Sequence, residues 1–234
     1  MNLLTLGVET SGMTGSIALR RAGLFVEAVS LQQAGRRHAQ TLVAEVDALL
    51  RRAGVSPQQL NVVAVSIGPG SFTGLRVGVV FAKALAYAVG CQLAAVDTFR
   101  AIAAASPADV SEVFVLSDAQ RGDLFVGNYA VGDSASGPTQ RSIISIESSK
   151  TFCQRISATT DSQWNIAISG PAAAKLRSVL PQCQRVLASE HQHPRAEFVA
   201  MLGEQQVLAG ERSDPWLLEP FYLRRVAAEE KADS

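Results

Sequence analysis

Residues 62–90 read VVAVSIGPGSFTGLRVGVVFAKALAYAVG, and this stretch decides the fold that we expect. Its first six residues are uncharged and mostly apolar, which is typical of a strand buried on both faces. The Gly-Pro-Gly that follows breaks the strand. We expect Ser71 or Thr73 to cap the next helix, and Gly90 to end it in the left-handed conformation.

The predicted helix, from about residue 74 to 89, is apolar almost all round, and only Arg76 and Lys83 carry charge. Such a helix is buried on more than one side. Small residues form a ridge along it, at Gly74, Gly78, Ala82 and Ala86. A ridge without bulk lets a second helix approach closely, whether that helix belongs to this chain, to a partner protein or to both. A membrane span is disfavoured, because Lys83 interrupts the run and a span needs about 20 apolar residues.

The composition narrows the class of protein. The chain has 234 residues, 47% hydrophobic and 18% charged, which predicts a sizeable core in one large domain or two small ones. Lys+Arg 21 balances Asp+Glu 21, so the chain lacks the excess of basic residues expected of a protein that binds nucleic acid on its own. The three cysteines fit neither a disulfide framework nor a zinc site. No basic segment precedes the first apolar run, so we expect no signal peptide, no membrane association and a cytoplasmic protein.

The order of elements predicts an α/β fold built from a repeated scheme. Three short strands within residues 3–31 precede a helix, the buried strand, the long helix, another strand and a helix near 97–105. The order is β-β-β-α-β-α-β-α, and the second half repeats it with helices that include 172–180 and 195–208. We predict an N-terminal lobe of residues 1–105 that carries a partner interface, and a C-terminal lobe of residues 106–234. The final helix could pack back on the first lobe.

Two glycine-containing segments could hold an anion. The turn of residues 9–12, Glu-Thr-Ser-Gly, offers backbone amides that could receive a phosphate. The helix start at residues 70–74 could do the same. The second segment is not a Walker A loop, since the terminal Gly-Lys-Ser/Thr is missing. We favour a structural turn over a nucleotide site.

Neither a metal site nor a catalytic group can be argued from spacing. His38 is followed one turn later by Leu42, so the helix carries no His-x-x-x-His pair. His191 and His193 lie in a polar loop. The charged residues of 118–123 could form a site, but turn and ion-pair roles explain them as well. We therefore predict no catalytic, cofactor-binding or metal-ligating residue, and no cofactor.

Five stretches, in order across nearly the whole chain, together resemble the TsaB (YeaZ) family. They are Val8–Ser11, Arg37–Gln40, Gly68–Gly78, Asp118–Gly122 and Leu218–Arg224. The third block is highly specific to that family. The first departs slightly, with Glu9 where Asp is usual, and so keeps a carboxylate.

The resemblance implies an actin-like ATPase-superfamily (ASKHA, RNase H-like) fold and a role in making threonylcarbamoyladenosine (t6A), the modified base beside the anticodon of tRNA. In that pathway the related TsaD transfers the threonylcarbamoyl group and holds the metal, and TsaE supplies an ATPase. The resemblance makes this chain a non-catalytic subunit that binds and activates TsaD and meets tRNA only through the complex. The alternative is an independent nucleotide-binding ATPase or a sugar-kinase-like enzyme, suggested by the turn at residues 9–12.

The resemblance also implies which residues meet the partner. The catalytic relative binds metal through two histidines one turn apart on its first helix, where this chain has His38 and then Leu42. The family's interface uses the first two helices. Mapped onto this sequence, it comprises His38, Leu42, Val46, Leu49, Gly74, Arg76, Val77, Gly78, Phe81, Ala82 and Leu85. Free members of the family self-associate through similar surfaces, so a homodimer would compete with the TsaD heterodimer.

Overall fold

The computed structural model describes residues 2–31, 38–132, 137–158, 165–178, 180 and 185–223, without the side chains of 38–40. Its first half contains β1 (Leu4–Glu9), β2 (Gly15–Arg21), β3 (Leu24–Leu31), α1 (His38–Arg52), β4 (Val62–Gly68), α2 (Phe72–Val89), β5 (Gln92–Asp97) and α3 (Thr98–Ala103). Its second half contains β6 (Glu112–Gln120), β7 (Asp123–Ala130), β8 (Thr139–Ser148), α4 (Ser149–Ala158), β9 (Ile166–Ser169), α5 (Ala173–Leu176), β10 (Arg185–Val186) and α6 (Ala196–Leu208). Short 3-10 turns lie at Pro57–Gln59 and Ser189–His191.

The described strands form two five-stranded sheets with the same connectivity. The first has the order β3-β2-β1-β4-β5, and the second has the order β10-β9-β6-β7-β8. In each sheet the first three strands in sequence run antiparallel, the fourth pairs with the first in parallel, and the fifth pairs with the fourth in parallel. The duplicated α/β scheme predicted from the order of elements is therefore confirmed.

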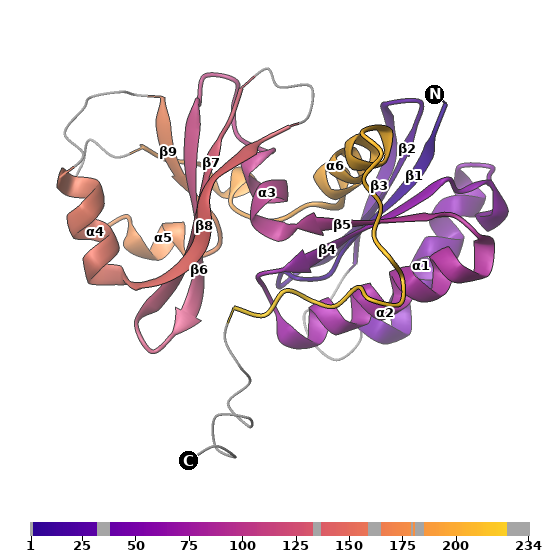
Figure 1. Ribbon diagram of the computed structural model, residues 1–234, viewed down its shortest axis with the longest axis horizontal. Coiled ribbons are helices and arrows are strands. Elements are labelled where there is room, and N and C mark those ends of the chain that lie inside the picture. The colour runs from indigo at the N-terminus through magenta and orange to yellow at the C-terminus, as the bar shows by residue number, and fades with distance from the viewer. Residues whose placement is uncertain are drawn as a thin grey trace, which may run out of the picture.

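The apolar strand β4 is buried on both faces because each face meets a different helix layer. Val63 and Val65 belong to the core beneath α1 and α2, while Val62 and Ala64 pack with α6. Figure 1 shows the same arrangement: α1 and α2 cover one face of the first sheet and α6 covers the other. An uninterrupted apolar run is what a strand needs between two such layers.

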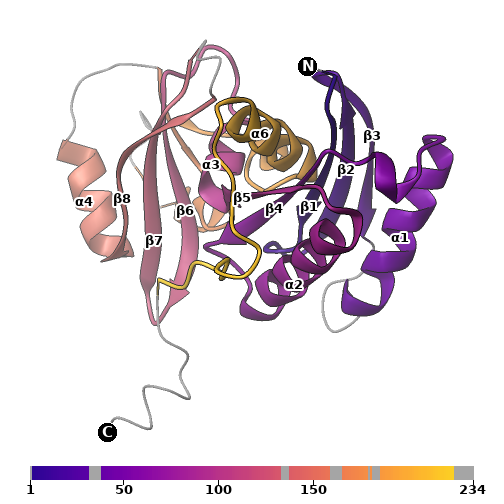
Figure 2. The ribbon, with the colours of Figure 1, turned by 45° about the vertical axis from the view of Figure 1, so that its right-hand side comes forward.

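Two helices lie between the sheets (Figure 2). The helix α3 contacts β4 and β5 of the first sheet and β6 and β7 of the second. The helix α6 comes from the second half of the chain, yet it packs along β1, β2, β4 and β5. The division into lobes at residues 105 and 106 stays a prediction.

The predicted ends of α2 are confirmed. The hydroxyl of Ser71 accepts a hydrogen bond from the Gly74 amide at 3.3 Å, and Gly90 ends the helix with φ 72°. The helix predicted over 172–180 is wrong in length, because α5 covers Ala173–Leu176. A proline at position 181 disfavours a helical conformation at Leu180, which argues against a helix that continues to its expected end.

Among the described residues, α2 is the helix with the length and hydropathy of a membrane span. Core helices of globular proteins pass the same test. Six residues along one side of α2 are buried in this chain, where they cover the first sheet. We therefore treat α2 as a sheet-covering helix.

One buried hydrogen bond joins the two sheets. The Tyr129 hydroxyl on β7 donates to Oδ2 of Asp97, and Oδ1 of Asp97 accepts from the Phe99 amide as the cap of α3. Burial raises the pKa of Asp97, and the hydrogen bond from Tyr129 opposes that shift. The link therefore stabilises a carboxyl group that would otherwise be poorly solvated.

Replacing Tyr129 with phenylalanine should lower the free energy of unfolding by about 2 kcal/mol, because a buried acceptor loses its donor. Urea denaturation measures this loss. Tyr87→Phe is the matched control, since it removes the same atom from a tyrosine that is 72% exposed and should change stability by less than about 0.5 kcal/mol. Equal effects of the two variants would contradict the assigned role of the buried bond.

Candidate partner interface and the turn after β1

The small-residue ridge of α2 faces the chain's own first sheet. A Cβ added at Gly74 would overlap the carbonyl oxygen of Thr10, and one added at Gly78 would overlap the Thr10 hydroxyl. Ala82 is also fully buried. At Gly74 and Gly78 the ridge therefore meets the turn after β1 and not the second helix that we expected. The ridge is small because α2 must approach the turn after β1 closely.

Three residues predicted for the interface on α1 are also buried within the chain. Leu42, Val46 and Leu49 belong to the core between α1, α2 and the first sheet. They lie on the apolar side of an amphipathic helix, which is the side that packs against a sheet. They are corrected from interface to core residues. The side chain of His38 lies outside the described part of the chain.

The other α2 residues that were predicted for the interface lie either at the edge of the core or on the surface. Val77, Phe81 and Leu85 are partly buried and pack against the first core, whereas Arg76 is exposed. The assignment of these four to a partner interface remains a prediction.

Exposed apolar side chains that the sequence prediction missed lie on both helices. Val43 on α1 is 61% exposed, and Val80 and Tyr87 on α2 are 65% and 72% exposed. Ala84 lies between the last two and is also exposed. We call these four residues the outer face. Their spacing of four and three on α2 was visible in the sequence, but a helix that is apolar all round does not reveal which side the sheet covers.

A C-terminal segment, residues 211–223, runs along the flank of α2, and we call it the strap (Figure 1). The Phe221 amide donates to the Ile67 carbonyl at 2.7 Å, and Lys83 Nζ donates to the Leu218 carbonyl at 3.0 Å. The Ser213 amide donates to the Leu93 carbonyl at the edge of β5. The strap thus explains Lys83, one of the two charged residues of α2.

Aromatic contacts fix the strap further. The Arg76 guanidinium lies 3.8 Å from the ring centre of Phe72, and its Nε donates to the Tyr222 hydroxyl at 3.1 Å. Further along, the rings of Tyr87 and Trp216 meet edge to face with centres 5.7 Å apart. Trp216 is itself 77% exposed, so the strap extends the apolar surface beside the outer face.

The turn after β1 is closed by its own acidic residue. Oε1 of Glu9 accepts hydrogen bonds from the Ser11 amide and hydroxyl, both at 2.5 Å, and from the Gly12 amide at 3.1 Å. Burial raises the pKa of Glu9, while these hydrogen bonds oppose the shift. The structural reading of this turn is supported, since both amides already have an acceptor.

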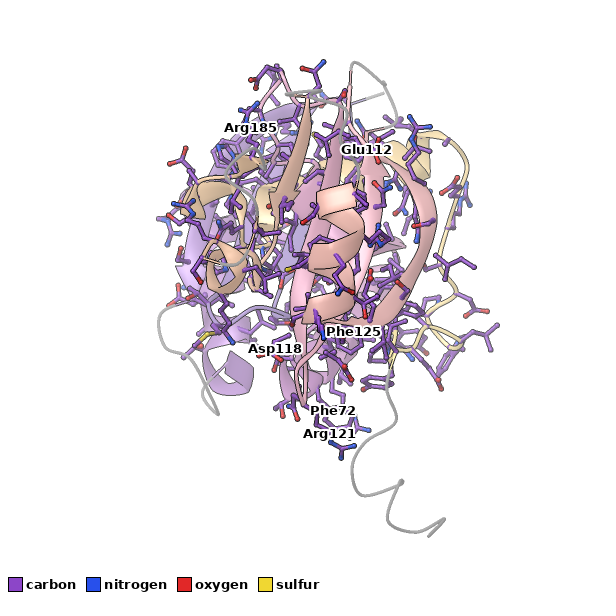
Figure 3. All side chains as sticks on the ribbon, turned by 90° about the vertical axis from the view of Figure 1, so that its left-hand side faces the viewer. Phe72, Glu112, Asp118, Arg121, Phe125 and Arg185 are labelled. Carbon is purple, nitrogen blue, oxygen red and sulfur yellow. The ribbon has the colours of Figure 1, made fainter. Side chains whose placement is uncertain are left out.

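The β6–β7 hairpin carries the charged stretch singled out in the sequence. Figure 3 shows Asp118 and Arg121 at the end of this hairpin. Asp118 accepts from the Gln120 amide at 2.7 Å and from Lys175 Nζ at 2.9 Å, and the lysine contact holds the pKa of Asp118 below its usual value. A hollow of about 400 Å³ lies beside these residues. The contacts of Asp118 fit the turn and ion-pair roles.

The described residues contain no group of three or more His, Cys, Asp and Glu side chains that could hold a metal ion.

The fold is shared with a solved bacterial structure. YeaZ from Pseudomonas aeruginosa superimposes with a TM-score of 0.79 over 94% of this chain and 100% of that chain, at 24% sequence identity. Together with the two sheets of identical connectivity, this likeness shows the actin-like ATPase (ASKHA, RNase H-like) fold.

A family model described as TsaD, tRNA N6-adenosine threonylcarbamoyltransferase, matches residues 29–232. TsaB of Bacillus subtilis (strain 168) is 32% identical over 124 residues, which are 53% of this chain and 54% of that protein. TsaB of Haemophilus influenzae (strain ATCC 51907 / DSM 11121 / KW20 / Rd) is 32% identical over 105 residues, 45% of this chain and 44% of that protein. The chain belongs to the TsaD family, within its TsaB (YeaZ) group.

Both of these TsaB relatives are tRNA threonylcarbamoyladenosine biosynthesis proteins by name. The TsaB group thus places the chain in a family of t6A biosynthesis. The alignments span about half the length of these TsaB relatives.

Proposed function

We propose that this chain is a non-catalytic subunit of the t6A synthesis complex, and that it binds TsaD through the outer face of α1 and α2. The observation that carries the proposal is the apolar outer face itself, where Val43, Val80 and Tyr87 are each more than half exposed. Exposed apolar patches mark interaction sites on soluble proteins, and tyrosine and tryptophan are enriched among the residues that supply most of the binding energy. The strap continues this surface with Trp216.

The position of the second metal ligand of the catalytic relative supports a non-catalytic role. One turn after His38 this chain has Leu42, whose side chain is buried in the core of the first half. An apolar side chain offers no ligand atom, and its burial leaves no space for one nearby. In this proposal, transfer of the threonylcarbamoyl group is left to TsaD.

The remaining partners follow from the same proposal. TsaE joins the complex as its ATPase, tRNA is met through the assembled complex, and the chain alone forms a homodimer through the same outer face. The protein acts in the cytoplasm. A nucleotide-binding enzyme is less well supported, because Glu9 already occupies the amides of the turn that would hold a phosphate.

Val80→Glu tests this proposal. A charge placed in an apolar interface should weaken binding to TsaD of the same organism by at least about 100-fold, because the carboxylate loses its hydration without gaining a partner. Calorimetric titration measures the dissociation constant, and light scattering gives the mass of the mixed complex. The free energy of unfolding should change by less than about 0.5 kcal/mol, since Val80 is exposed.

Ile143→Glu is the matched control, because Ile143 is 85% exposed on the edge strand β8 of the second sheet. It should bind TsaD as tightly as the unaltered chain. If Val80→Glu also binds normally, the outer face is not the interface. If the unaltered chain ignores TsaD, the proposal of a TsaD-binding subunit fails altogether.

A further inference from the structure

The turn that follows β1 directs consecutive donors at one atom. The amides of Ser11 and Gly12 and the hydroxyl of Ser11 all donate to Oε1 of Glu9. Consecutive backbone N–H groups that converge in this way form a nest, which is a general binding arrangement for an anion. In this chain the atom at the centre of the nest belongs to the chain itself.

The carboxyl group depends on the nest because little else solvates it. Glu9 is fully buried, and its other oxygen, Oε2, has no hydrogen-bond partner among the described residues. The hydroxyl of Ser66 on β4 is also buried, and its proximity opposes the rise in the pKa of Glu9. A buried carboxyl group needs hydrogen bonds to offset its lost hydration, and Oε1 receives those from Ser11 and Gly12.

The surroundings close the nest to solution. Pro194, from the second half of the chain, lies against Gly12, and the Ser71 amide donates to the Ser11 carbonyl at 2.8 Å. The Thr10 hydroxyl donates to the Gly74 carbonyl at 2.7 Å, so the turn also fixes the start of α2. A displaced carboxylate would therefore disturb both the turn and the helix.

We propose that residues 9–12 form an anion site whose resident anion is the Glu9 carboxylate, and that this internal anion excludes phosphate in solution from the turn. The consequence is specific: the amides that could hold a nucleotide phosphate are satisfied before any nucleotide arrives. This inference does not depend on whether the outer face binds TsaD.

Glu9→Ala with added acetate tests the proposal. The substitution removes the CH₂–COO⁻ fragment that acetate replaces. We expect Glu9→Ala to lower the Tm by roughly 10 °C, because three donors lose their acceptor. Acetate, at ionic strength held constant with chloride, should then raise the Tm of this variant saturably. Thermal unfolding followed by circular dichroism measures both effects.

Glu9→Gln is the matched control, since its amide oxygen can still accept from the nest. Acetate should leave the Tm of Glu9→Gln and of the unaltered chain unchanged. The proposal is overturned if acetate shifts all three proteins alike or rescues none of them.

A measurement on the unaltered chain covers the case in which Glu9→Ala does not fold. The amide protons of Ser11 and Gly12, observed by NMR, should be protected from exchange and should keep their chemical shifts when inorganic phosphate is added. A saturable shift of either amide would show that solution anions enter the turn, and the idea of a resident carboxylate would be abandoned.

Discussion

Replacing Gly78 with leucine is expected to lower the free energy of unfolding by about 3 kcal/mol or more, or to abolish folding. The new side chain would overlap the Thr10 hydroxyl and press on Val65 of β4. Helix propensity alone predicts the opposite sign, a gain of roughly 1 kcal/mol over glycine. Urea denaturation followed by circular dichroism therefore decides which effect dominates.

The control for this substitution is Ala84→Leu on the same helix. Ala84 is exposed, so the larger side chain should change the free energy of unfolding by less than about 0.5 kcal/mol. If Gly78→Leu is as stable as Ala84→Leu, there is space beside Gly78 for a larger side chain, contrary to the structure. The ridge would then again be a candidate surface for a partner helix.

Gly7→Val should destabilise the fold by a similar amount, about 3 kcal/mol or more, through the opposite face of the first sheet. A Cβ at Gly7 would overlap the backbone oxygen of Ala196 and crowd Ala200, both on α6. Valine is a good strand former, so an exposed position would tolerate or favour it. At position 7 valine must push α6 away from β1, and thermal or urea unfolding would detect the resulting loss of stability.

Gly132→Val makes the same change where an added Cβ meets no atom of the described residues within 4 Å. It should leave the unfolding transition within about 0.5 kcal/mol of the unaltered chain. A Gly7→Val protein as stable as Gly132→Val would mean that α6 is not held closely against β1.

The order of helices and strands was predicted well because the apolar patterns and the helix-ending glycines indicate the same boundaries. The run of residues 62–67 has the composition of a doubly covered strand, and the glycines at 54 and 90 end their helices with φ 66° and 72°. The helix at 172–180 was predicted too long, since its apolar pattern was read past Leu176, where α5 ends. The two-residue strand β10 was missed, because such a short strand exists only through its pairing with β9.

Most of the residues predicted for the partner interface lie on the buried sides of α1 and α2. Gly74 and Gly78 were assigned to a partner because small residues at a spacing of four permit close helix contact. The same spacing also permits close approach to a turn, and the sequence does not show that Thr10 lies there. Which side of an all-round apolar helix is exposed depends on contacts between residues more than 60 positions apart.

The arrangement of α6 has a consequence for synthesis on the ribosome. One face of the first sheet, with Val62 and Ala64, is covered largely by α6, which follows the second sheet in the sequence. The second sheet and its packing partners, from α3 to Leu187, emerge earlier. A nascent chain can thus complete its second sheet first, while the first sheet keeps part of an apolar face uncovered until α6 emerges.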